Sequence, residues 1–189
     1  MIIRMATPED APDVLAIYSP YIRDTAVTFE VKAPSNAEYA RKIEKILGRF
    51  PYLVAEHNGK VRAYAYASPS GEHAAYQWNA ELLVYVNGDY QHRGLGSRLY
   101  NVLIELLGLL GYRNLYALIT LPNEGSISMH QRLGFTPLAV HKNAGYKLGR
   151  RHNVAWLEKN LGPYRPEPDA PILMKKLAPE QLRRVLENT

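Results

Sequence analysis

A glycine-rich turn within residues 81–97 has the clearest chemical potential in this sequence. It reads Gln91-x-x-Gly94-x-Gly96 and separates an apolar run of β-strand character from a long apolar segment that begins at Ser97. Glycine at positions 94 and 96 permits backbone conformations closed to other residues and lets a ligand approach closely. Free N–H groups of such a turn, at the positive end of a helix dipole, would form a cradle for an anion such as a pyrophosphate.

Other nucleotide-binding patterns fit this turn less well. The dinucleotide fingerprint Gly-x-Gly-x-x-Gly needs a third glycine where this chain has Leu99. The phosphate-loop pattern Gly-x-x-x-x-Gly-Lys-[Ser/Thr] is absent from the sequence. The turn therefore favours an acyl-coenzyme A over NAD or ATP, and an ordinary strand–helix connection without a ligand is the alternative.

Glu81 is a single carboxylate in an otherwise apolar strand, residues 80–86. Strand alternation places it on the same face as Leu83 and Tyr85. A carboxylate at such a position is partly desolvated, which raises its pKa toward the range useful for a general base. A surface glutamate or a structural ion pair would explain the same residue without chemistry, and the pattern of residues by itself favours neither explanation.

A second motif, residues 121–135, follows about thirty residues after the turn and contains Leu-Pro-Asn123, Met-His130 and Gly134-Phe. Asn123 is typical of a helix N-cap, and Gly134 can end that helix. His130 lies within the predicted helix. It could act on a proton or position a substrate, or it could be a histidine packed in the interior.

The composition limits the class of protein. A chain of 189 residues with 47% apolar residues indicates one domain with a substantial core. The absence of cysteine excludes disulfides, cysteine-bound metals and a thiol acyl-enzyme. A net charge of +5 suits an anionic cofactor, but the lysines and arginines are scattered, so no nucleic-acid partner is expected. The six histidines lack metal-ligand spacing, which predicts no metal site.

Hydropathy gives no indication of a membrane segment. No apolar run reaches about 18 residues, and the N-terminus lacks a charged-then-apolar signal pattern. The sequence therefore predicts a cytoplasmic protein without membrane contact.

Helical and strand periodicities alternate along the chain and predict an α/β fold. Strands are expected at residues 2–5, 52–56, 62–68, 78–86, 114–120, 135–140 and 152–159. Helices are expected at residues 10–23, 35–49, 96–110, 124–133 and 179–187. The composition changes at Gly162, so we interpret residues 1–161 as one domain and residues 162–189 as a Pro-rich extension with a short helix. That extension is either a docking or dimer-stabilising arm or a loosely ordered terminus.

Several spaced motifs resemble one family in the same order. Beside the turn and the second motif, they are the N-terminal segment 1–10, Thr-Ala-Val-Thr-Phe-Glu at 25–30 and Gly-Tyr-Lys-Leu-Gly at 145–149. From residue 1 to about 160 the chain resembles the GNAT superfamily of N-acetyltransferases, in its phosphinothricin acetyltransferase-like branch. The resemblance implies a homodimer and a mixed, mostly antiparallel central sheet of about six to seven strands. That sheet would be splayed apart at the cofactor slot and flanked by about four helices.

The implied activity is transfer of an acetyl group from acetyl-CoA to the primary amine of a small molecule, an amino acid or analogue, within a ternary complex. In this branch a glutamate at the place of Glu81 is the base, so Glu81 is expected to take the ammonium proton. Many GNAT enzymes carry a tyrosine at the place of His130, so His130 is expected to protonate the leaving sulfur or to position the amine. An acetyltransferase of peptide or protein amines and a non-catalytic acyl-CoA sensor are the alternatives.

The resemblance also implies which residues bind the acyl donor. The backbone of Val84, Tyr85 and Val86 is expected to pair with the pantetheine arm, and Asn123 to bond its thioester end. The pyrophosphate is expected on Gln91, His92, Arg93, Gly94, Leu95, Gly96 and Ser97. For Arg93, a solvated surface position is an equally good explanation.

The acceptor pocket is expected to include five residues from separate segments. They are Phe29, Glu30, His73, Tyr76 and Lys147. Phosphinothricin-acetylating members carry an arginine at the place of His73, and a histidine is a poor replacement for a bidentate guanidinium. The resemblance therefore disfavours phosphinothricin itself and favours another small amine, such as methionine sulfoximine. Lys147 could instead belong to a solvated edge.

Overall fold

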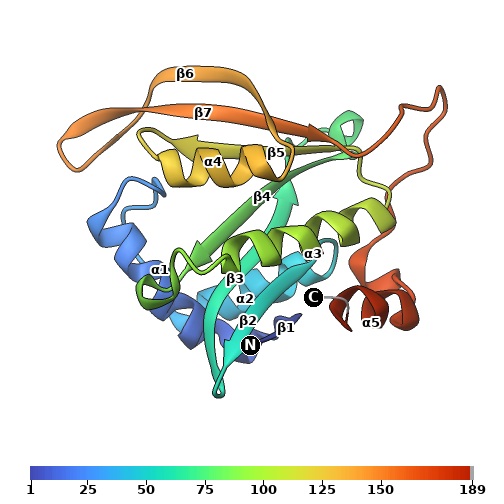
Figure 1. The fold of residues 1–189 in the computed structure, drawn as a ribbon, viewed down its shortest axis with the longest axis horizontal. Coiled ribbons are helices and arrows are strands. Elements are labelled where there is room, and N and C mark those ends of the chain that lie inside the picture. The colour runs from blue at the N-terminus through green and yellow to red at the C-terminus, as the bar shows by residue number, and fades with distance from the viewer. Residues whose placement is uncertain (188–189) are drawn as a thin grey trace.

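The computed structural model describes residues 1–187 as an open seven-stranded sheet with helices on both faces (Figure 1). The strand order is β1-β2-β3-β4-β5-β7-β6, and β4–β5 is the parallel pair in a sheet that is otherwise antiparallel. The strands are β1 Ile2–Met5, β2 Tyr52–His57, β3 Lys60–Pro69, β4 Asn79–Val86, β5 Asn114–Thr120, β6 Thr136–Lys147 and β7 Arg150–Asn160. The helices are α1 Ala11–Asp24, α2 Asn36–Leu47, α3 Leu95–Leu109, α4 Glu124–Arg132 and α5 Pro179–Glu187. This architecture confirms the predicted fold class, strand number and strand directions.

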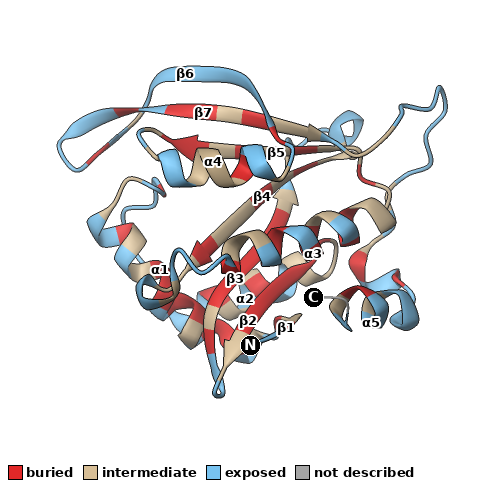
Figure 2. Cartoon of the chain, in the orientation of Figure 1, coloured by how far each residue is buried: buried red, intermediate tan, exposed pale blue. Residues whose placement is uncertain are grey.

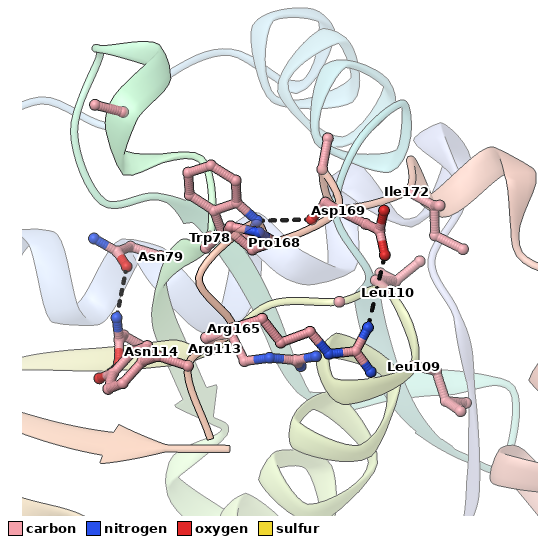
Figure 3. Close-up of a pocket in the computed structure, with 14 residues that line it drawn as sticks. Trp78, Asn79, Leu109, Leu110, Arg113, Asn114, Arg165, Pro168, Asp169 and Ile172 are labelled. Atoms are coloured by element: carbon pink, nitrogen blue, oxygen red, sulfur yellow. Dashed lines mark hydrogen bonds and ion pairs between the residues drawn. The ribbon is translucent and has the colours of Figure 1, made fainter. Parts of the chain in front are cut away.

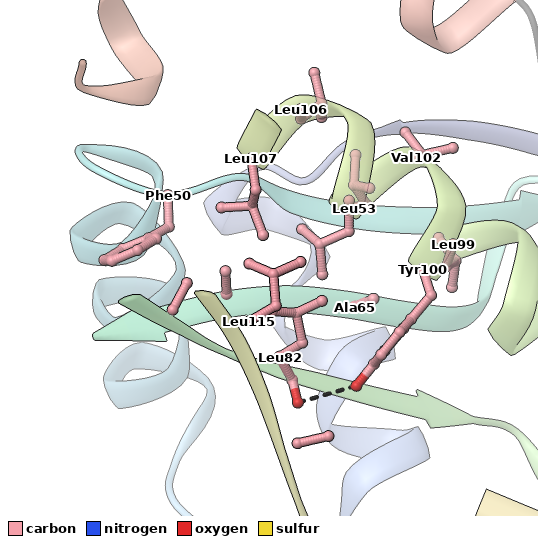
Figure 4. Close-up of a cluster of buried hydrophobic side chains, with 14 of the residues drawn as sticks. Phe50, Leu53, Ala65, Leu82, Leu99, Tyr100, Val102, Leu106, Leu107 and Leu115 are labelled. Atoms are coloured by element: carbon pink, nitrogen blue, oxygen red, sulfur yellow. Dashed lines mark hydrogen bonds between the residues drawn. The ribbon is translucent and has the colours of Figure 1, made fainter. Parts of the chain in front are cut away.

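Two buried clusters lie on opposite faces of the sheet. One packs α3 against the sheet and includes Leu82 of β4 (Figure 4), and the other packs α1 and α2 against the opposite face and includes Tyr85. The alternation of β4 side chains thus divides this strand between both cores. Fully buried leucines such as Leu99 and Leu103 each contribute about 1.5–3 kcal/mol through burial. Figure 2 shows the buried central strands between less buried outer elements.

The two central strands separate after a short stretch of pairing. β4 and β5 pair only at Asn79/Asn114, Ala80/Leu115 and Glu81/Tyr116. Beyond Glu81, β4 continues beside β3, and β5 continues beside β7. This divergence confirms the predicted splay and leaves one side of β4 without a strand partner.

The C-terminal extension packs on its own chain. Trp78 Nε1 donates to the Asp169 carbonyl at 2.8 Å (Figure 3), and Met174 N donates to the Arg49 carbonyl at 3.1 Å. Met174 and Val185 are buried in the same core as α3. These contacts tie the extension to the segment before β4 and to the region after α2.

The hairpin of β6 and β7 is longer than the predicted strands 135–140 and 152–159. Pairing continues to Lys147/Arg150, with register shifts before Ala139 and between His141 and Gly145. These irregularities break the period-two pattern, so the sequence did not indicate the outer half of β6. None of the helices within residues 1–187 has the length and apolar composition to span a bilayer.

Candidate active site

The glycine-rich turn forms one end of a cavity at the start of α3. Gly94 is the N-cap of α3 and adopts φ +75°, the left-handed region that glycine enters without a steric penalty. At Gly96, a Cβ would lie 3.2 Å from Met129 Sδ of α4, so the glycine allows close approach of the two helices. The cavity has a volume of ≈ 540 Å³, within the range typical of ligand sites.

Most residues predicted to hold a pyrophosphate line this cavity. They are Gln91, His92, Gly94, Leu95, Gly96 and Ser97. Arg93 is absent from the lining; its guanidinium lies 5.2 Å from the centre of the Tyr90 ring. Six of the seven predicted positions are therefore brought together, and Arg93 is turned toward an aromatic neighbour.

Tyr21 and Arg132 are among the residues of this cavity that the sequence analysis did not predict as site residues. Tyr21 of α1 donates its hydroxyl hydrogen to the Val86 carbonyl at 2.6 Å and accepts from Gln91 Nε2 at 2.8 Å. Arg132, at the end of α4, adds a cation to the lining. Tyr21 and Arg132 come from helices far from the turn in sequence, and only the tertiary arrangement brings them to it.

The backbone of β4 presents alternate residues to the gap. The Leu82 carbonyl accepts a hydrogen bond from α3 rather than from β3, whereas Asn87 N donates to a β3 carbonyl. Since backbone polar groups alternate along a strand, those of Val84 and Val86 point into the gap and those of Tyr85 point to β3. Two of the three backbone positions predicted to pair with a pantetheine arm are thus directed into the gap between β4 and β5.

Glu81 stands where the β4–β5 pairing ends. Its register partner Tyr116 is the last in the parallel ladder. Burial raises the pKa of the Glu81 carboxyl above its usual value of 4.5, because the charged form is poorly solvated there. A carboxylate at this position can accept a proton closer to neutral pH than an ordinary glutamate can.

His130 is buried and both ring nitrogens have partners. Nδ1 lies 2.8 Å from the Ser126 carbonyl, and Nε2 lies 3.1 Å from the Tyr100 hydroxyl. Burial lowers the pKa of His130, and the hydrogen bond to the Ser126 carbonyl opposes that effect. Tyr100, an isolated aromatic hydroxyl in an apolar helix, was not singled out by the sequence analysis.

Asn123 joins the two halves of the slot. It caps α4, with its Oδ1 accepting from Ser126 N at 3.2 Å, as its N-cap pattern predicted. It lines both the cavity at the turn and a narrower cavity of ≈ 60 Å³ between β4 and β5, which His130 and Tyr100 also line. The slot therefore runs from the turn to the end of the β4–β5 pairing.

The predicted acceptor residues fall into two groups. Lys147 is buried and donates from Nζ to the Thr28 carbonyl at 2.7 Å, while Phe29 packs against Gly145, where a Cβ would lie 2.5 Å from the ring. Burial lowers the pKa of Lys147, and the negative charge of Glu30 opposes that effect. Lys147 is thus no solvated edge residue: the hairpin and the 25–30 loop hold each other.

His73 and Tyr76 form the second group, in the loop between β3 and β4. Both are exposed, and their ring centroids lie 6.4 Å apart. No hydrogen bond or ion pair within residues 1–187 joins them to Phe29 or Glu30. Among the same residues, no three histidine, aspartate or glutamate side chains gather closely enough to hold a metal ion.

The fold provides a slot between two diverging strands whose shape and backbone donors suit an extended, anion-bearing ligand, with the half-buried carboxylate of Glu81 where the pairing of the strands ends. Residues 3–156 match the acetyltransferase (GNAT) domain family. The chain belongs to the GNAT family of acetyltransferases.

Relatives and solved structures agree with this family. The chain is 36% identical to the phosphinothricin N-acetyltransferase of Streptomyces viridochromogenes, covering 90% of this chain and 93% of that protein. It is 30% identical to an L-methionine sulfoximine/L-methionine sulfone acetyltransferase of Salmonella typhimurium, covering 85% and 95%. A GNAT phosphinothricin acetyltransferase of Sinorhizobium meliloti, crystallised with acetyl-CoA, superposes with a TM-score of 0.82 at 32% identity, covering 85% and 88%.

Proposed function

We propose that this protein transfers the acetyl group of acetyl-CoA to the primary amine of a small amino acid or amino-acid analogue. The observation that carries the proposal is Glu81, a half-buried carboxylate of raised pKa at the point where the β4–β5 pairing ends. The activities named for the relatives, on phosphinothricin and on methionine sulfoximine, support the class of acceptor. Direct attack in a ternary complex fits a chain without cysteine.

The residues of the slot suit an acyl-CoA. Backbone N–H groups at Gly94–Ser97 and the cation of Arg132 would hold the pyrophosphate. The gap-facing backbone of Val84 and Val86 would pair with the pantetheine arm as an added strand. When bound, acetyl-CoA supplies the thioester carbonyl that an amine attacks.

Glu81 would act as the general base. An amino acid arrives mostly as an ammonium ion, because model amino groups have a pKa of about 8. Glu81 takes the ammonium proton, directly or through one water, and thereby frees the lone pair for attack. The raised pKa of Glu81 makes it a stronger base than an exposed glutamate.

The acceptor side would be built on the 25–30 loop. Phe29 supplies an apolar wall and Glu30 a negative charge that suits an ammonium group, while Lys147 fixes the loop through the Thr28 carbonyl. His73 and Tyr76 would form the rim. A histidine rather than an arginine at the rim favours acceptors with a weakly charged side chain.

The test is release of free CoA from acetyl-CoA with a panel of acceptors that includes methionine sulfoximine, phosphinothricin, neutral amino acids and peptides. We expect turnover on a free amino acid or analogue. In Glu81→Gln, kcat should fall by about 10²–10⁴-fold with acetyl-CoA binding retained, whereas the exposed Glu105→Gln should behave as wild type. Turnover on peptides alone, or a fully active Glu81→Gln, would contradict the proposal.

The pH profile gives a further check on Glu81. A base must be deprotonated, so kcat/KM should fall as the pH drops through the pKa of Glu81. Because burial raises that pKa, the midpoint of the acid limb should lie above 4.5. An acid limb at or below 4.5 would exclude Glu81 as the base.

We further propose a homodimer in the cytoplasm, where acetyl-CoA is available. The long edge strand β6 supports self-association: it is exposed along most of its length (Figure 2), with Leu138, Val140 and Tyr146 at least half exposed. Light scattering should give the mass of two chains. Replacing Val140 with lysine should shift that mass toward one chain.

A further inference from the structure

Four polar groups form a chain at the inner end of the slot. The Tyr100 hydroxyl donates to the Leu82 carbonyl at 3.0 Å (Figure 4), and the same oxygen lies 3.1 Å from His130 Nε2. On its other side, His130 Nδ1 lies 2.8 Å from the Ser126 carbonyl oxygen and 3.4 Å from the Ser126 hydroxyl oxygen. Tyr100 and His130 are 1% and 3% exposed, so water cannot readily replace a missing partner.

A count of hydrogens shows that this chain is one hydrogen short. The Ser126 carbonyl contact is much the shorter of the two, and a carbonyl can only accept, so Nδ1 of His130 must carry the hydrogen that faces it. The Ser126 hydroxyl then cannot donate to Nδ1. In the neutral ring Nε2 is then an acceptor, and it faces the same Tyr100 hydroxyl that faces the Leu82 carbonyl. Tyr100 has one hydrogen for these two acceptors, so one contact lacks a donor.

Two events can supply the missing hydrogen. A proton on His130 Nε2 lets the ring donate to Tyr100, which then donates to Leu82, and every contact is satisfied. Alternatively, another donor can satisfy the Leu82 carbonyl, which frees the Tyr100 hydrogen for Nε2. Leu82 follows the last β4–β5 pair and lines the cavity between the strands, and its backbone polar groups point to the β5 side, so a ligand in the slot can reach its carbonyl.

Within residues 1–187, no other charged group near His130 takes part in the competition between the Leu82 carbonyl and His130 Nε2 for the Tyr100 hydrogen. Glu81 of β4 acts on Tyr100 rather than on the histidine, and together with burial it raises the tyrosine pKa, so the hydroxyl stays protonated. Lys159 of β7 lies beside Gly134, outside the ring contacts of His130. Facing residues of β5 in the cavity, Ala117 and Ile119, are uncharged.

We propose that Tyr100 is a positioning residue that couples the arm of the acyl donor to the protonation state of His130. The pantetheine arm contains two amide N–H groups, and one of them takes over the Leu82 carbonyl. The Tyr100 hydrogen then turns to Nε2 and fixes the neutral tautomer of His130 with hydrogen on Nδ1. In the loaded enzyme both ring nitrogens are occupied, so His130 organises the slot rather than giving a proton directly to sulfur. This inference rests on the proposed use of acetyl-CoA.

The experiment is a ¹⁵N NMR titration of His130 in the whole protein, free and saturated with CoA. We expect CoA to lower the pKa of His130 in wild type and to leave the ring with hydrogen on Nδ1. In Tyr100→Phe, CoA should still bind but should not move the His130 titration. Tyr112→Phe is the matched control, because it removes another buried tyrosine hydroxyl from the same core away from the slot.

Binding affinity gives the reciprocal measurement. If CoA lowers the pKa of His130, then His130 deprotonation must strengthen CoA binding. CoA should therefore bind roughly three- to tenfold more tightly at a pH above the pKa of His130 than at a pH below it. The 3′-phosphate of CoA itself titrates at about pH 6. Dephospho-CoA lacks this group and should show the same change in affinity, which assigns the change to the protein. His130→Gln, which does not titrate, should bind dephospho-CoA without this pH dependence. This variant tests the coupling if Tyr100→Phe does not fold.

Two results would overturn the coupling: a His130 titration that CoA leaves unchanged, or a Tyr100→Phe variant that responds as wild type does. Failure of the wild-type protein to bind CoA at any pH would instead contradict the proposed function, and the coupling with it.

Discussion

The two ends of the slot are built in different ways. At the proposed donor end, one continuous segment around Gly94 presents backbone N–H groups at the start of α3. At the proposed acceptor end, the candidate side chains come from the 25–30 loop, the β3–β4 loop and the β6–β7 hairpin. A site made of backbone depends on local conformation, whereas a site made of distant side chains depends on packing. The donor end should therefore be sensitive to glycine substitutions and the acceptor end to loss of the contacts that hold its loop.

Among variants that distinguish the two ends, the largest effect is expected from Lys147→Met at the acceptor end. The substitution keeps most of the side-chain volume but removes the buried hydrogen bond from Nζ to the Thr28 carbonyl. A hydrogen bond from a charged group is worth about 1.5–3 kcal/mol, so kcat/KM for the acceptor should fall roughly 10- to 100-fold. The KM for acetyl-CoA should stay unchanged. Steady-state kinetics with each substrate varied would measure both constants.

Lys142→Met, on an exposed part of β6, is the matched control and should keep wild-type kinetics. If Lys147→Met changed both KM values equally, the two ends would not be independent.

At the donor end, Gly94→Ala is expected to have the next largest effect. Forcing alanine into φ +75° costs about 1–2 kcal/mol, and relief of this strain would turn the N–H groups away from the anion. We expect the KM for acetyl-CoA to rise about 5- to 30-fold with acceptor specificity unchanged. Gly59→Ala is a close control, because Gly59 has φ +69° and equally open surroundings at the tip of the β2–β3 hairpin.

Thermal unfolding separates strain from loss of binding. Both glycine variants should lose similar stability, but only Gly94→Ala should lose affinity for acetyl-CoA. Equal KM values for the two variants would argue against a backbone cradle.

His73→Arg should change acceptor preference by a smaller factor. A guanidinium at the exposed rim can form a paired hydrogen bond with an acidic side group, which an imidazole cannot. We expect kcat/KM for phosphinothricin relative to methionine sulfoximine to rise a few-fold, roughly the value of one exposed ion pair. Competition between the two acceptors in one reaction gives the ratio directly. An unchanged ratio would place His73 outside the acceptor site.

The smallest effect is expected from Arg93→Ala. Its guanidinium lies over the Tyr90 ring rather than on the cavity, so the KM for acetyl-CoA should change less than about twofold. Arg132→Ala should raise that KM more, and salt should diminish the difference because screening weakens charge contacts. The reverse order of effects would show that Arg93 turns to the ligand when it binds.

Local patterns predicted the conformation of the turn and the helix start well. Residues 91–97 are contiguous, and glycine at the N-cap of a helix has a direct conformational meaning, so the turn could be identified without a fold. Asn123 was predicted as a helix cap from its residue type and the helix that follows, and the structure confirms it. The position of Glu81 on the face of Leu83 and Tyr85 followed from strand alternation, and the environment that raises its pKa agrees with that prediction.

The acceptor end and the inner slot were predicted less completely. Lys147 could not be distinguished from a solvated lysine, because its partner is the carbonyl of a residue far away in the chain. Tyr21 and Arg132 were missed for the same reason: each belongs to a helix whose own pattern is satisfied without a ligand. The hairpin was underestimated because irregular register removes the alternation that marks a strand.

The sequence by itself determined the elements, the family and the glycine-rich turn proposed to cradle an anion, because helix periodicity, strand alternation and turn glycines act over a few neighbouring residues. Tertiary structure alone decided where β4 parts from β5, and it alone placed the Tyr100 hydroxyl between Leu82 and His130. Those contacts join residues separated by whole elements, and burial gives them their energy. Whether a polar group is a surface residue or part of a site depends on the low-dielectric neighbours that folding brings to it.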